Sequence, residues 1–455
     1  MSVPLQAARH LFGTDGIRGV AGEFPLDPRS TFAVGRALGI YLARQHASQH
    51  VVIGMDTRES GPQIAESVAA GLASAGATAE SAGVITTPGV AYLARTRDFA
   101  AGIVISASHN PWRDNGIKIF GHDGFKLSDA SEMEIEAIIF SELNGSAAPP
   151  PLLAPLHHDS SLDHDYAEWL LAHVSARLGG IRAVIDCANG AAVDLAPEVF
   201  DRAGLRAVFT HNTANGRNIN EDCGALHPET VAREVKQRAL DLGICFDGDA
   251  DRVLFADSNG NVVNGDALLL LAARDLKSRN ALKGDLVVAT TMSNMGLEAA
   301  LKRSGIKMLR APVGDKYVLE EMNKTGATLG GEQSGHILFR DGDATTGDGL
   351  LTALRILEII ARSGKSLADL LSDFKVFPQT IQNIRVREKK PLKQIPEVAE
   401  AIAAAERSLD GNGRVVVRYS GTEKLARVMV EAVSEALVRK YADSISGAIR
   451  SSIGE

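Results

Sequence analysis

The chain has 455 residues and a formal charge of −8 at pH 7, with 45% hydrophobic and 23% charged residues. This composition is typical of a globular protein of about three domains, and the net negative charge argues against a nucleic-acid or anionic-membrane partner. Its 3 cysteines lack the CxxC spacing of a zinc site or a disulfide framework. No apolar run approaches the ~18 residues of a spanning helix, and MSVPLQAARHLFGTDG has no apolar signal-peptide core, so we expect a cytoplasmic protein.

Three stretches of the sequence share one predicted plan, which indicates an internal triplication. Each opens with an apolar strand, continues with an amphipathic helix that ends on glycine, and closes with a strand that runs into a polar loop. Glycine at a helix end can adopt the left-handed conformation that turns the chain into the next strand. The opening strands, glycines and closing loops are HVVIGMD, Gly76 and SASHNP (106–111); RAVIDCANG, Gly204 and DGDADR (247–252); and DLVVATTMSN, Gly305 and GEQSGH (331–336).

Alternating strands and helices predict α/β layers with largely parallel sheets, which bind ligands at their strand ends. The Pro-rich segment 144–155 forms a joint after the first repeat, and after 373–380 the pattern changes to β-α-β-β-α. We therefore predict an α/β protein with three related α/β domains that have mixed sheets between helices, followed by a C-terminal α+β domain of different topology. The predicted domains are 1–154, 155–257, 258–373 and 374–455.

The loop DGDADR is the most specific of the polar loops. Asp247, Asp249 and Asp251 alternate, so in an extended segment their carboxylates would point the same way and would repel each other unless a cation lay between them. Hard oxygen ligands favour Mg²⁺ or Mn²⁺ over zinc. The alternatives are a solvated acidic turn and an EF-hand, and the EF-hand is disfavoured because Ser258 stands where its loop needs Glu. The loop thus predicts a Mg²⁺ site with a coordination place left for a phosphate oxygen.

The loop SASHNP follows the apolar strand GIVIS and precedes NGIK, residues 115–118. Ser108 can supply the phosphate oxygen if it is phosphorylated, which adds about two negative charges near pH 7. Taken alone, Ser108 would more often be a turn hydroxyl, His109 a core histidine, and Lys118 a solvated surface charge. The Ser108 hypothesis therefore depends on the neighbouring motifs.

The loop GEQSGH offers Glu332, Ser334 and His336. Their alternation predicts one shared face, where Glu and Ser beside two glycines can bind neighbouring sugar hydroxyls. An ordinary β-turn is the alternative interpretation.

Two arginine-containing loops are candidate anion sites. In RYSGTE (418–423), Arg418 offers a fork for phosphate oxygens, and Ser420, Gly421 and Thr422 offer hydroxyls and an N–H nest. Arg427 can assist. In GTDGIRG (13–19), Arg18 stands between glycines, and neither loop is a Walker loop, since GxxxxGK[ST] is absent.

In combination, these motifs make the sequence resemble the phosphohexomutase superfamily. LFGTDGIRG, SASHNP with NGIK, DGDADR, GEQSGH and RYSGTE occur in the family's order over essentially the whole chain. NINEDCGALHPE and VGDKYVLEEM resemble the bacterial phosphoglucosamine mutase subfamily. The resemblance implies three related α/β domains and a fourth outside the repeat, around a central cleft. Tyr419 and Lys424 depart from the family pattern, which commonly has Pro at both positions.

The resemblance also implies a role for each motif. Ser108 becomes the phosphoserine and, with Asp247, Asp249 and Asp251, a ligand of one Mg²⁺. Glu332 and Ser334 contact sugar hydroxyls, and the last loop holds the substrate's non-reacting phosphate. The residues expected to manage charge and protons are Arg18, Lys118, Arg252 and His336, and His109 and Arg427 are further substrate contacts.

The implied reaction interconverts glucosamine 6-phosphate and glucosamine 1-phosphate, on the route to UDP-N-acetylglucosamine, through a hexosamine 1,6-bisphosphate. Such a transfer needs positioning and charge neutralisation and a general base, either Lys118 with a lowered pKa or His336. The sequence shows no clear binding partner for the amino group at C2 of the sugar, so a phosphoglucomutase/phosphomannomutase is the alternative function. Two alternatives come from other functional classes. One is a metal-dependent phosphatase in which an Asp is the nucleophile, and the other is a sugar-phosphate sensor without catalytic activity. The only macromolecular partner expected is a second copy in a homodimer.

Overall fold

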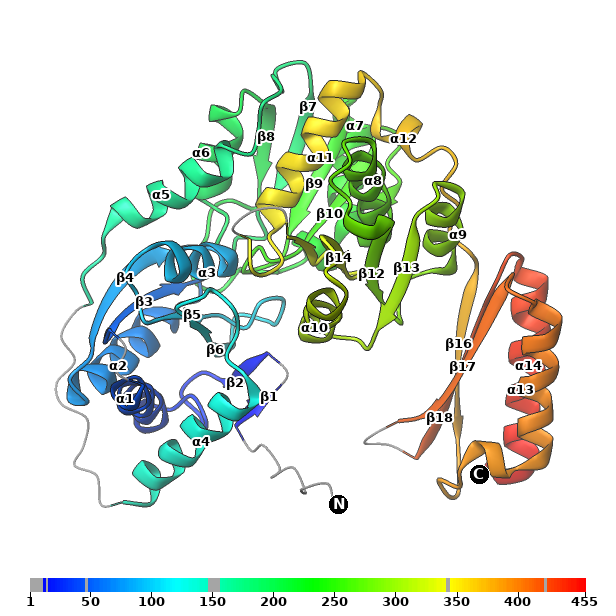
Figure 1. Ribbon diagram of the computed structural model, residues 1–455, viewed down its shortest axis with the longest axis horizontal. Coiled ribbons are helices and arrows are strands. Elements are labelled where there is room, and N and C mark those ends of the chain that lie inside the picture. Colours follow the sequence, from blue (N-terminus) through cyan, green and yellow to red (C-terminus); the bar gives the residue numbers. More distant parts are fainter. Residues whose placement is uncertain (1–10, 14, 46–47, 146–155, 341–343, 421–423) are drawn as a thin grey trace. The chain divides into compact units, whose positions relative to one another are not determined.

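The structure of the chain is a computed structural model that describes residues 11–13, 15–45, 48–145, 156–340, 344–420 and 424–455 (Figure 1). Two compact units make up the chain. The first comprises Met1–Thr291 and Leu309–Ser372, and the second comprises Met292–Met308 and Asp373–Glu455. Among the described residues, no helix is both long and apolar enough to cross a membrane.

Three of the four sheets repeat one four-strand pattern. Their strand orders include β4-β3-β5-β6, β8-β7-β9-β10 and β13-β12-β14-β15, so the opening strand of each repeat lies inside its sheet. The third strand runs parallel to the opening strand, and the fourth runs antiparallel to the third. The strands of these three patterns are β3 (His50–Met55), β4 (Thr78–Val84), β5 (Ala101–Ile105), β6 (Asp114–Gly121), β7 (Arg182–Asp186), β8 (Arg206–Thr210), β9 (Leu242–Phe246), β10 (Val253–Asp257), β12 (Leu286–Thr290), β13 (Lys307–Ala311), β14 (Leu329–Gly331) and β15 (Ile337–Phe339).

The shared strand order confirms the predicted fold class of three related α/β domains. Short strands extend two of the sheets at the edge: β1 (Phe12–Gly13) and β2 (Gly16–Val20) join the first, and β11 (Val262–Val263) joins the second. The predicted joint at 144–155 lies almost wholly outside the described residues.

A helix follows each of the first two strands of every repeat. The helices after the opening strands are followed by Gly76, Gly204 and Gly305, whose φ angles of 85°, 79° and 68° confirm the predicted left-handed turns. The helices of the chain are α1 (Pro28–Arg44), α2 (Gly61–Ser74), α3 (Thr87–Thr96), α4 (Asp129–Asn144), α5 (Ser160–Leu171), α6 (Leu195–Arg202), α7 (Pro228–Arg238), α8 (Gly265–Ser278), α9 (Met295–Arg303), α10 (Asp315–Thr325), α11 (Gly349–Ser363), α12 (Leu367–Leu370), α13 (Pro396–Leu409) and α14 (Glu435–Ile453).

Buried apolar side chains of the sheets and of the helix faces hold the repeats together. In the first repeat, Val51 and Ile53 of β3 join Val68 and Leu72 of α2 in one core, all fully buried. Such alternation on a strand and three- to four-residue spacing on a helix are the signals that predicted these elements. The cores hold the sheets, and therefore the loops at their strand ends, in place.

The second unit has the predicted β-α-β-β-α order. Its antiparallel sheet has the order β16-β18-β17, with β16 (Gln379–Arg385), β17 (Gly413–Tyr419) and β18 (Leu425–Ala432). Helices α13 and α14 pack on the sheet around a separate buried core (Figure 1). Helix α9, although it follows β12 in sequence, belongs to this unit, where Asn294 Nδ2 donates to Phe377 O at 3.0 Å.

The three polar loops of the first unit occupy equivalent places, because each connects the third and fourth strands of its repeat. SASHNP connects β5 to β6, DGDADR connects β9 to β10, and GEQSGH connects β14 to β15. The triplication therefore presents one polar loop per repeat at the end of a buried strand.

Candidate active site

The serine of the first loop lies against the acidic loop of the second repeat. Ser108 is 1% exposed, and its Oγ donates to Asp247 Oδ2 at 2.7 Å. The same Oγ lies 3.3 Å from His109 Nδ1. A hydroxyl from the first repeat thus reaches the carboxylates of the second, as the metal-bound phosphoserine hypothesis requires.

A buried arginine holds the serine loop in shape. Arg58 pairs with Asp56 at 2.8 Å, and both side chains are fully buried. Ser106 Oγ donates to the same carboxylate at 2.6 Å and accepts from Ser108 N at 2.9 Å. The guanidinium also donates to the backbone carbonyls of Ser108, Asn110, Pro111 and Asp114. These bonds fix Ser108 at a φ of 52°, a left-handed conformation that is uncommon for a non-glycine residue.

The acidic loop gathers its three carboxylates through a tight turn, so the expected extended conformation is wrong. Ala250 adopts a φ of 54°, and Ala250 N donates to Asp247 O at 3.0 Å. Carboxylate oxygens of Asp247, Asp249 and Asp251 still lie within 4.8 Å of one another, and all three residues are buried. The curled backbone achieves the convergence that alternation in a strand was expected to provide.

This carboxylate cluster fits a divalent cation. Asp249 Oδ1 and Asp251 Oδ1 are buried and have no hydrogen-bond partner among the described residues, and unsatisfied buried oxygens are costly unless a ligand binds them. Burial, with the charges of Asp251 and Asp249, raises the pKa of Asp247 well above its ordinary value. A cation bound by hard oxygen ligands would remove both penalties.

Lys118 is bound to the acidic cluster rather than poised as a base. Its Nζ lies 2.8 Å from Asp249 Oδ2 and 3.0 Å from Asp15 Oδ2, and the side chain is 2% exposed. Burial alone would lower its pKa, but the carboxylates of Asp15, Asp249 and Asp251 raise the pKa above its ordinary value. The expectation of a lowered pKa for Lys118 is therefore wrong, because its nearest neighbours are anions.

An ion-pair chain continues from Lys118 along the site. Asp15 Oδ1 pairs with Lys126 Nζ at 2.5 Å, and Lys126 pairs with Asp315 Oδ2 at 2.5 Å. Asp315 Oδ2 in turn lies 3.8 Å from His336 Nε2. The chain alternates in charge from the first repeat to the third, so it ties the two repeats together.

Arginines surround His109. Arg252 Nη1 lies 3.1 Å from His109 Nδ1, and burial together with the charges of Arg252 and Arg18 lowers the pKa of His109. Arg18 Nη2 pairs with Asp15 at 2.5 Å, and its Nη1 donates to Ala107 O at 3.4 Å. Arg252 and Arg18 therefore place positive charge beside His109, and Arg252 Nε also lies 3.8 Å from Asp251 Oδ1.

The third loop does not place its three polar side chains on one face, as alternation predicted. Glu332 and His336 are 9% and 3% exposed, whereas Ser334 is exposed, because Gly335 has a φ of 96° and turns the chain. Ser334 Oγ donates to Glu332 Oε2 at 3.2 Å, and Glu332 Oε1 accepts from Gly314 N at 3.0 Å. Ser334 thus supports Glu332 in this structure.

Burial and the neighbouring carboxylates shift the pKa of His336 in opposite directions. Burial lowers its pKa, but Asp251, Asp315 and Glu332 raise the pKa overall. Gly347 N donates to Nε2 at 3.2 Å, and Nδ1 lies 3.6 Å from Asp251 Oδ2.

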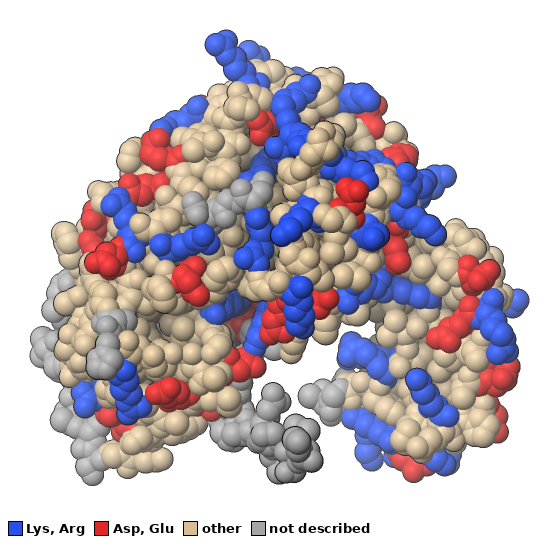
Figure 2. Space-filling view, in the orientation of Figure 1, with Lys and Arg blue, Asp and Glu red and all other residues tan. Residues whose placement is uncertain are grey.

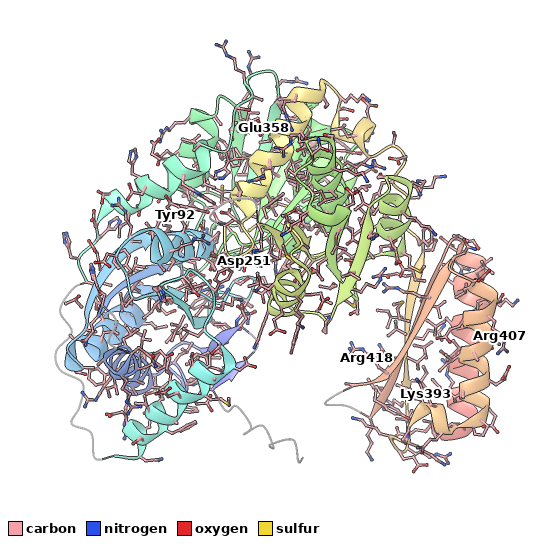
Figure 3. All side chains as sticks on the ribbon, in the orientation of Figure 1. Tyr92, Asp251, Glu358, Lys393, Arg407 and Arg418 are labelled. Atoms are coloured by element: carbon pink, nitrogen blue, oxygen red, sulfur yellow. The ribbon has the colours of Figure 1, made fainter. Side chains whose placement is uncertain are left out.

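A cavity of about 740 Å³ joins these groups within the first unit. Arg18, His109, Arg252, Glu332 and His336 line it, together with Asp251 (Figure 3). This volume falls in the range of small-molecule sites. The cavity brings most of the sequence-predicted residues of the first unit to one place.

The predicted phosphate loop belongs to the second unit. Arg418 of β17 is exposed, and Figure 3 labels it. In the antiparallel register it lies directly opposite Arg427 of β18. Figure 2 shows further Lys and Arg side chains on the surface of this unit. Like charges directly opposite each other destabilise a sheet, and an anion relieves that repulsion. Ser420 is 5% exposed, and its carbonyl accepts from Lys389 Nζ at 2.7 Å. Gly421 and Thr422 lie outside the described residues.

Several residues of the site escaped sequence reasoning. Two of them, Asp56 and Arg58, follow the opening strand of the first repeat. Another is Thr87, whose Oγ1 donates to Asp249 Oδ2 at 2.6 Å. The remaining three are the residues of the ion-pair chain, Asp15, Lys126 and Asp315. The signal for Asp56 was present, since the opening strands HVVIGMD and RAVID both end in Asp. No local pattern distinguishes Thr87 or Lys126 from surface residues.

Sequence models of four domain families match consecutive parts of the chain. They are described as phosphoglucomutase/phosphomannomutase alpha/beta/alpha domain I (residues 9–145), domain II (164–260) and domain III (264–377), and the C-terminal domain (382–448). The chain therefore belongs to the phosphoglucomutase/phosphomannomutase family, which confirms the resemblance read from the motifs.

Curated relatives and solved structures agree with this assignment. The phosphoglucosamine mutase of Koribacter versatilis (strain Ellin345) is 62% identical over 100% of both chains, and that of Solibacter usitatus (strain Ellin6076) is 53% identical over 98% of this chain and 100% of the relative. A phosphoglucomutase/phosphomannomutase family protein from Burkholderia thailandensis has a TM-score of 0.80 at 25% identity, covering 96% of this chain and 97% of that one. In fold, the chain is also similar to Aspergillus fumigatus N-acetylphosphoglucosamine mutase, solved with GlcNAc-6P and magnesium, with a TM-score of 0.64 at 19% identity, covering 97% and 96% of the two chains.

Proposed function

We propose that the protein interconverts glucosamine 6-phosphate and glucosamine 1-phosphate through a phosphoserine at Ser108 and a hexosamine 1,6-bisphosphate. The 2.7 Å contact between Ser108 Oγ and Asp247 Oδ2 carries this proposal, because it sets the hydroxyl of one repeat against the cation-binding carboxylates of another. The preference for glucosamine rests on the full-length relatives, which are phosphoglucosamine mutases.

Asp247, Asp249 and Asp251 would hold one Mg²⁺, with a phosphoserine oxygen as a further ligand. The cation would neutralise the charge that builds on the phosphoryl oxygens. Lys118 holds Asp249 in place and contributes a second positive charge. Arg18 and Arg252 add positive charge beside His109, and phosphoryl transfer needs such neutralisation more than covalent chemistry.

In the first transfer, a sugar hydroxyl forms a bond to phosphorus while the bond between phosphorus and Ser108 Oγ breaks. The hydroxyl proton passes to a basic group on the cavity wall, and His336 is the predicted acceptor that lines the cavity. The bisphosphate then turns end for end. In the second transfer, Ser108 Oγ forms a bond to the phosphorus of the other phosphate while the bond from that phosphorus to the sugar oxygen breaks, and the freed sugar oxygen takes up a proton. Glu332, with Ser334 behind it, would contact sugar hydroxyls in both poses.

The loop of the second unit would bind the phosphate that does not react. Arg418 and Arg427 face each other across β17 and β18, and two guanidinium forks suit phosphate oxygens. Gripping this distal phosphate would position the sugar and help to exclude water from the phosphoserine.

Mass and activity measurements test the proposal. The intact protein should carry one added phosphate, about 80 Da, and the Ser108→Ala variant should lack both this mass and mutase turnover. A coupled assay should show faster turnover of glucosamine 6-phosphate than of glucose 1-phosphate.

Other results would identify the alternatives. Equal or faster turnover of glucose 1-phosphate would favour the phosphoglucomutase/phosphomannomutase activity that the domain families also describe. Phosphate on an aspartate, with release of inorganic phosphate, would support a phosphatase. Sugar-phosphate binding without turnover would support a sensor. Light scattering tests the expected homodimer separately.

A further inference from the structure

Outside the site, three potential metal ligands of the second repeat converge. Asp186 ends β7, His211 directly follows β8, and Cys223 precedes α7. One ligand atom from each lies within 4.8 Å of the other two. Strands β7 and β8 are parallel neighbours, so Asp186 and His211 necessarily emerge at the same edge of the sheet. The cysteine spacing carried no sign of this cluster, because its ligands come from three separate segments.

The carboxylate of this cluster is held rigidly. Asp186 Oδ1 accepts from Ala188 N at 2.9 Å, and Oδ2 accepts from Gly224 N at 3.0 Å. Each carboxylate oxygen can accept more than one bond, so both keep capacity for another ligand. A side chain fixed in this way is pre-organised, as metal ligands are when a second partner orients them.

The imidazole points at the carboxylate of the cluster. His211 Nδ1 lies 3.1 Å from Asp186 Oδ2 and can pair with it when the ring is protonated. His211 and Asp222 adopt φ angles of 46° and 52°, and such left-handed non-glycine conformations persist only where the surroundings enforce them. A carboxylate, an imidazole and a thiol therefore lie close enough together to bind one cation.

We propose that Asp186, His211 and Cys223 form a binding site for a zinc-class divalent cation, distinct from the oxygen-only cluster of Asp247, Asp249 and Asp251. Thiolate, imidazole and carboxylate together are ligands that zinc accepts in tetrahedral sites. Magnesium is disfavoured because it prefers oxygen ligands in an octahedral arrangement. Water completes the fourth position, since the His211 side chain is 33% exposed and opens the cluster to solvent.

Without a cation, the thiol would stay protonated at neutral pH. Burial and the charges of Asp186, Asp222 and Glu221 raise the pKa of Cys223 to about 12. Metal binding replaces the thiol proton, which is released to solvent as the sulfur–metal bond forms.

The site connects structurally to the serine loop. The segment from His211 to Cys223 carries Asn220, whose Nδ2 donates to Ser108 O at 2.9 Å and to Asn110 O at 3.1 Å. A metal that fixes both ends of this segment would also steady the support beneath Ser108.

Cobalt provides a direct test, because a Co²⁺–thiolate bond absorbs in the near ultraviolet whereas Co²⁺ bound only by oxygen does not. The chelator-treated full-length protein is titrated with Co²⁺ in saturating Mg²⁺, which occupies the carboxylate cluster. We expect one equivalent of Co²⁺ to produce the thiolate band and one equivalent of Zn²⁺ to abolish it. The absence of the band in the unmodified protein would overturn the proposal.

Variants separate the ligands from their neighbours. Cys223→Ser should lose the band, while Cys245→Ser, the matched control in β9, should keep it. His211→Gln changes a partly exposed side chain and retains every thiol, so it checks the site even if the Cys223 variant folds poorly. It should weaken Co²⁺ binding by at least about tenfold. A band that persists in Cys223→Ser, or Co²⁺ affinity unchanged in His211→Gln, would refute the assigned ligands.

Discussion

Replacement of Arg58 by lysine tests whether the guanidinium fork, rather than its charge alone, positions the serine loop. In the structure the Arg58 side chain is buried, and it binds Asp56 and the carbonyls of Ser108, Asn110, Pro111 and Asp114. Lysine keeps the charge but has fewer donors and no planar fork. At least two of these hydrogen bonds would therefore be lost.

The expected cost follows from these contacts. Hydrogen bonds to charged groups contribute about 1.5–3 kcal/mol each, so losing two should destabilise the protein by roughly 3 kcal/mol or more. Because the released carbonyls include that of Ser108 or its neighbours, kcat should fall by at least about tenfold. KM should change much less, since Arg58 does not line the cavity.

Urea unfolding and the coupled mutase assay measure the two effects. Arg113→Lys is the matched control, because Arg113 is an exposed arginine of the same loop region that stacks 5.4 Å from the Trp112 ring. This control should change stability by no more than about 0.5 kcal/mol. If Arg58→Lys matched the control in both stability and kcat, the positioning argument would be wrong.

Three further predictions concern the metal, the pH dependence and the last loop. Asp249→Asn should raise the Mg²⁺ concentration for half-maximal activity by at least about tenfold, measured after chelation and back-titration. Asp241→Asn, a partly exposed control residue that pairs with Arg182, should not. Burial raises the pKa of Asp348 to about 6 from 3.8, so the protonated carboxyl contributes stability that is lost as pH rises from about 4 through 6, by about 3 kcal/mol in total. Asp348→Asn can still cap α11 and should flatten this part of the stability profile, and an unchanged profile would show that another group titrates. Tyr419→Phe removes the hydroxyl that donates to Lys390 O and should raise KM for the sugar phosphate a few-fold with kcat nearly unchanged; an equal loss in kcat would contradict a role in phosphate binding alone.

Local signals determined the elements and the repeat. The predicted opening strands HVVIGMD, RAVIDCANG and DLVVATTMSN contain β3, β7 and β12, because the pattern of apolar residues in a strand is a property of neighbouring residues. The same holds for the turns at Gly76, Gly204 and Gly305, whereas the pairing of Ser108 with the acidic triplet rested on the combination of motifs and the family resemblance.

Only the tertiary structure decided how these pieces act on one another. The raised pKa of Lys118 comes from Asp15 and Asp249, which lie far from it in sequence, and Arg58 reaches the serine loop across some fifty positions. The acidic loop converges through the left-handed Ala250 rather than through strand alternation. Interaction energies in a buried site depend on distance, direction and burial of side chains brought together by different repeats, and residue spacing along the chain does not encode those quantities.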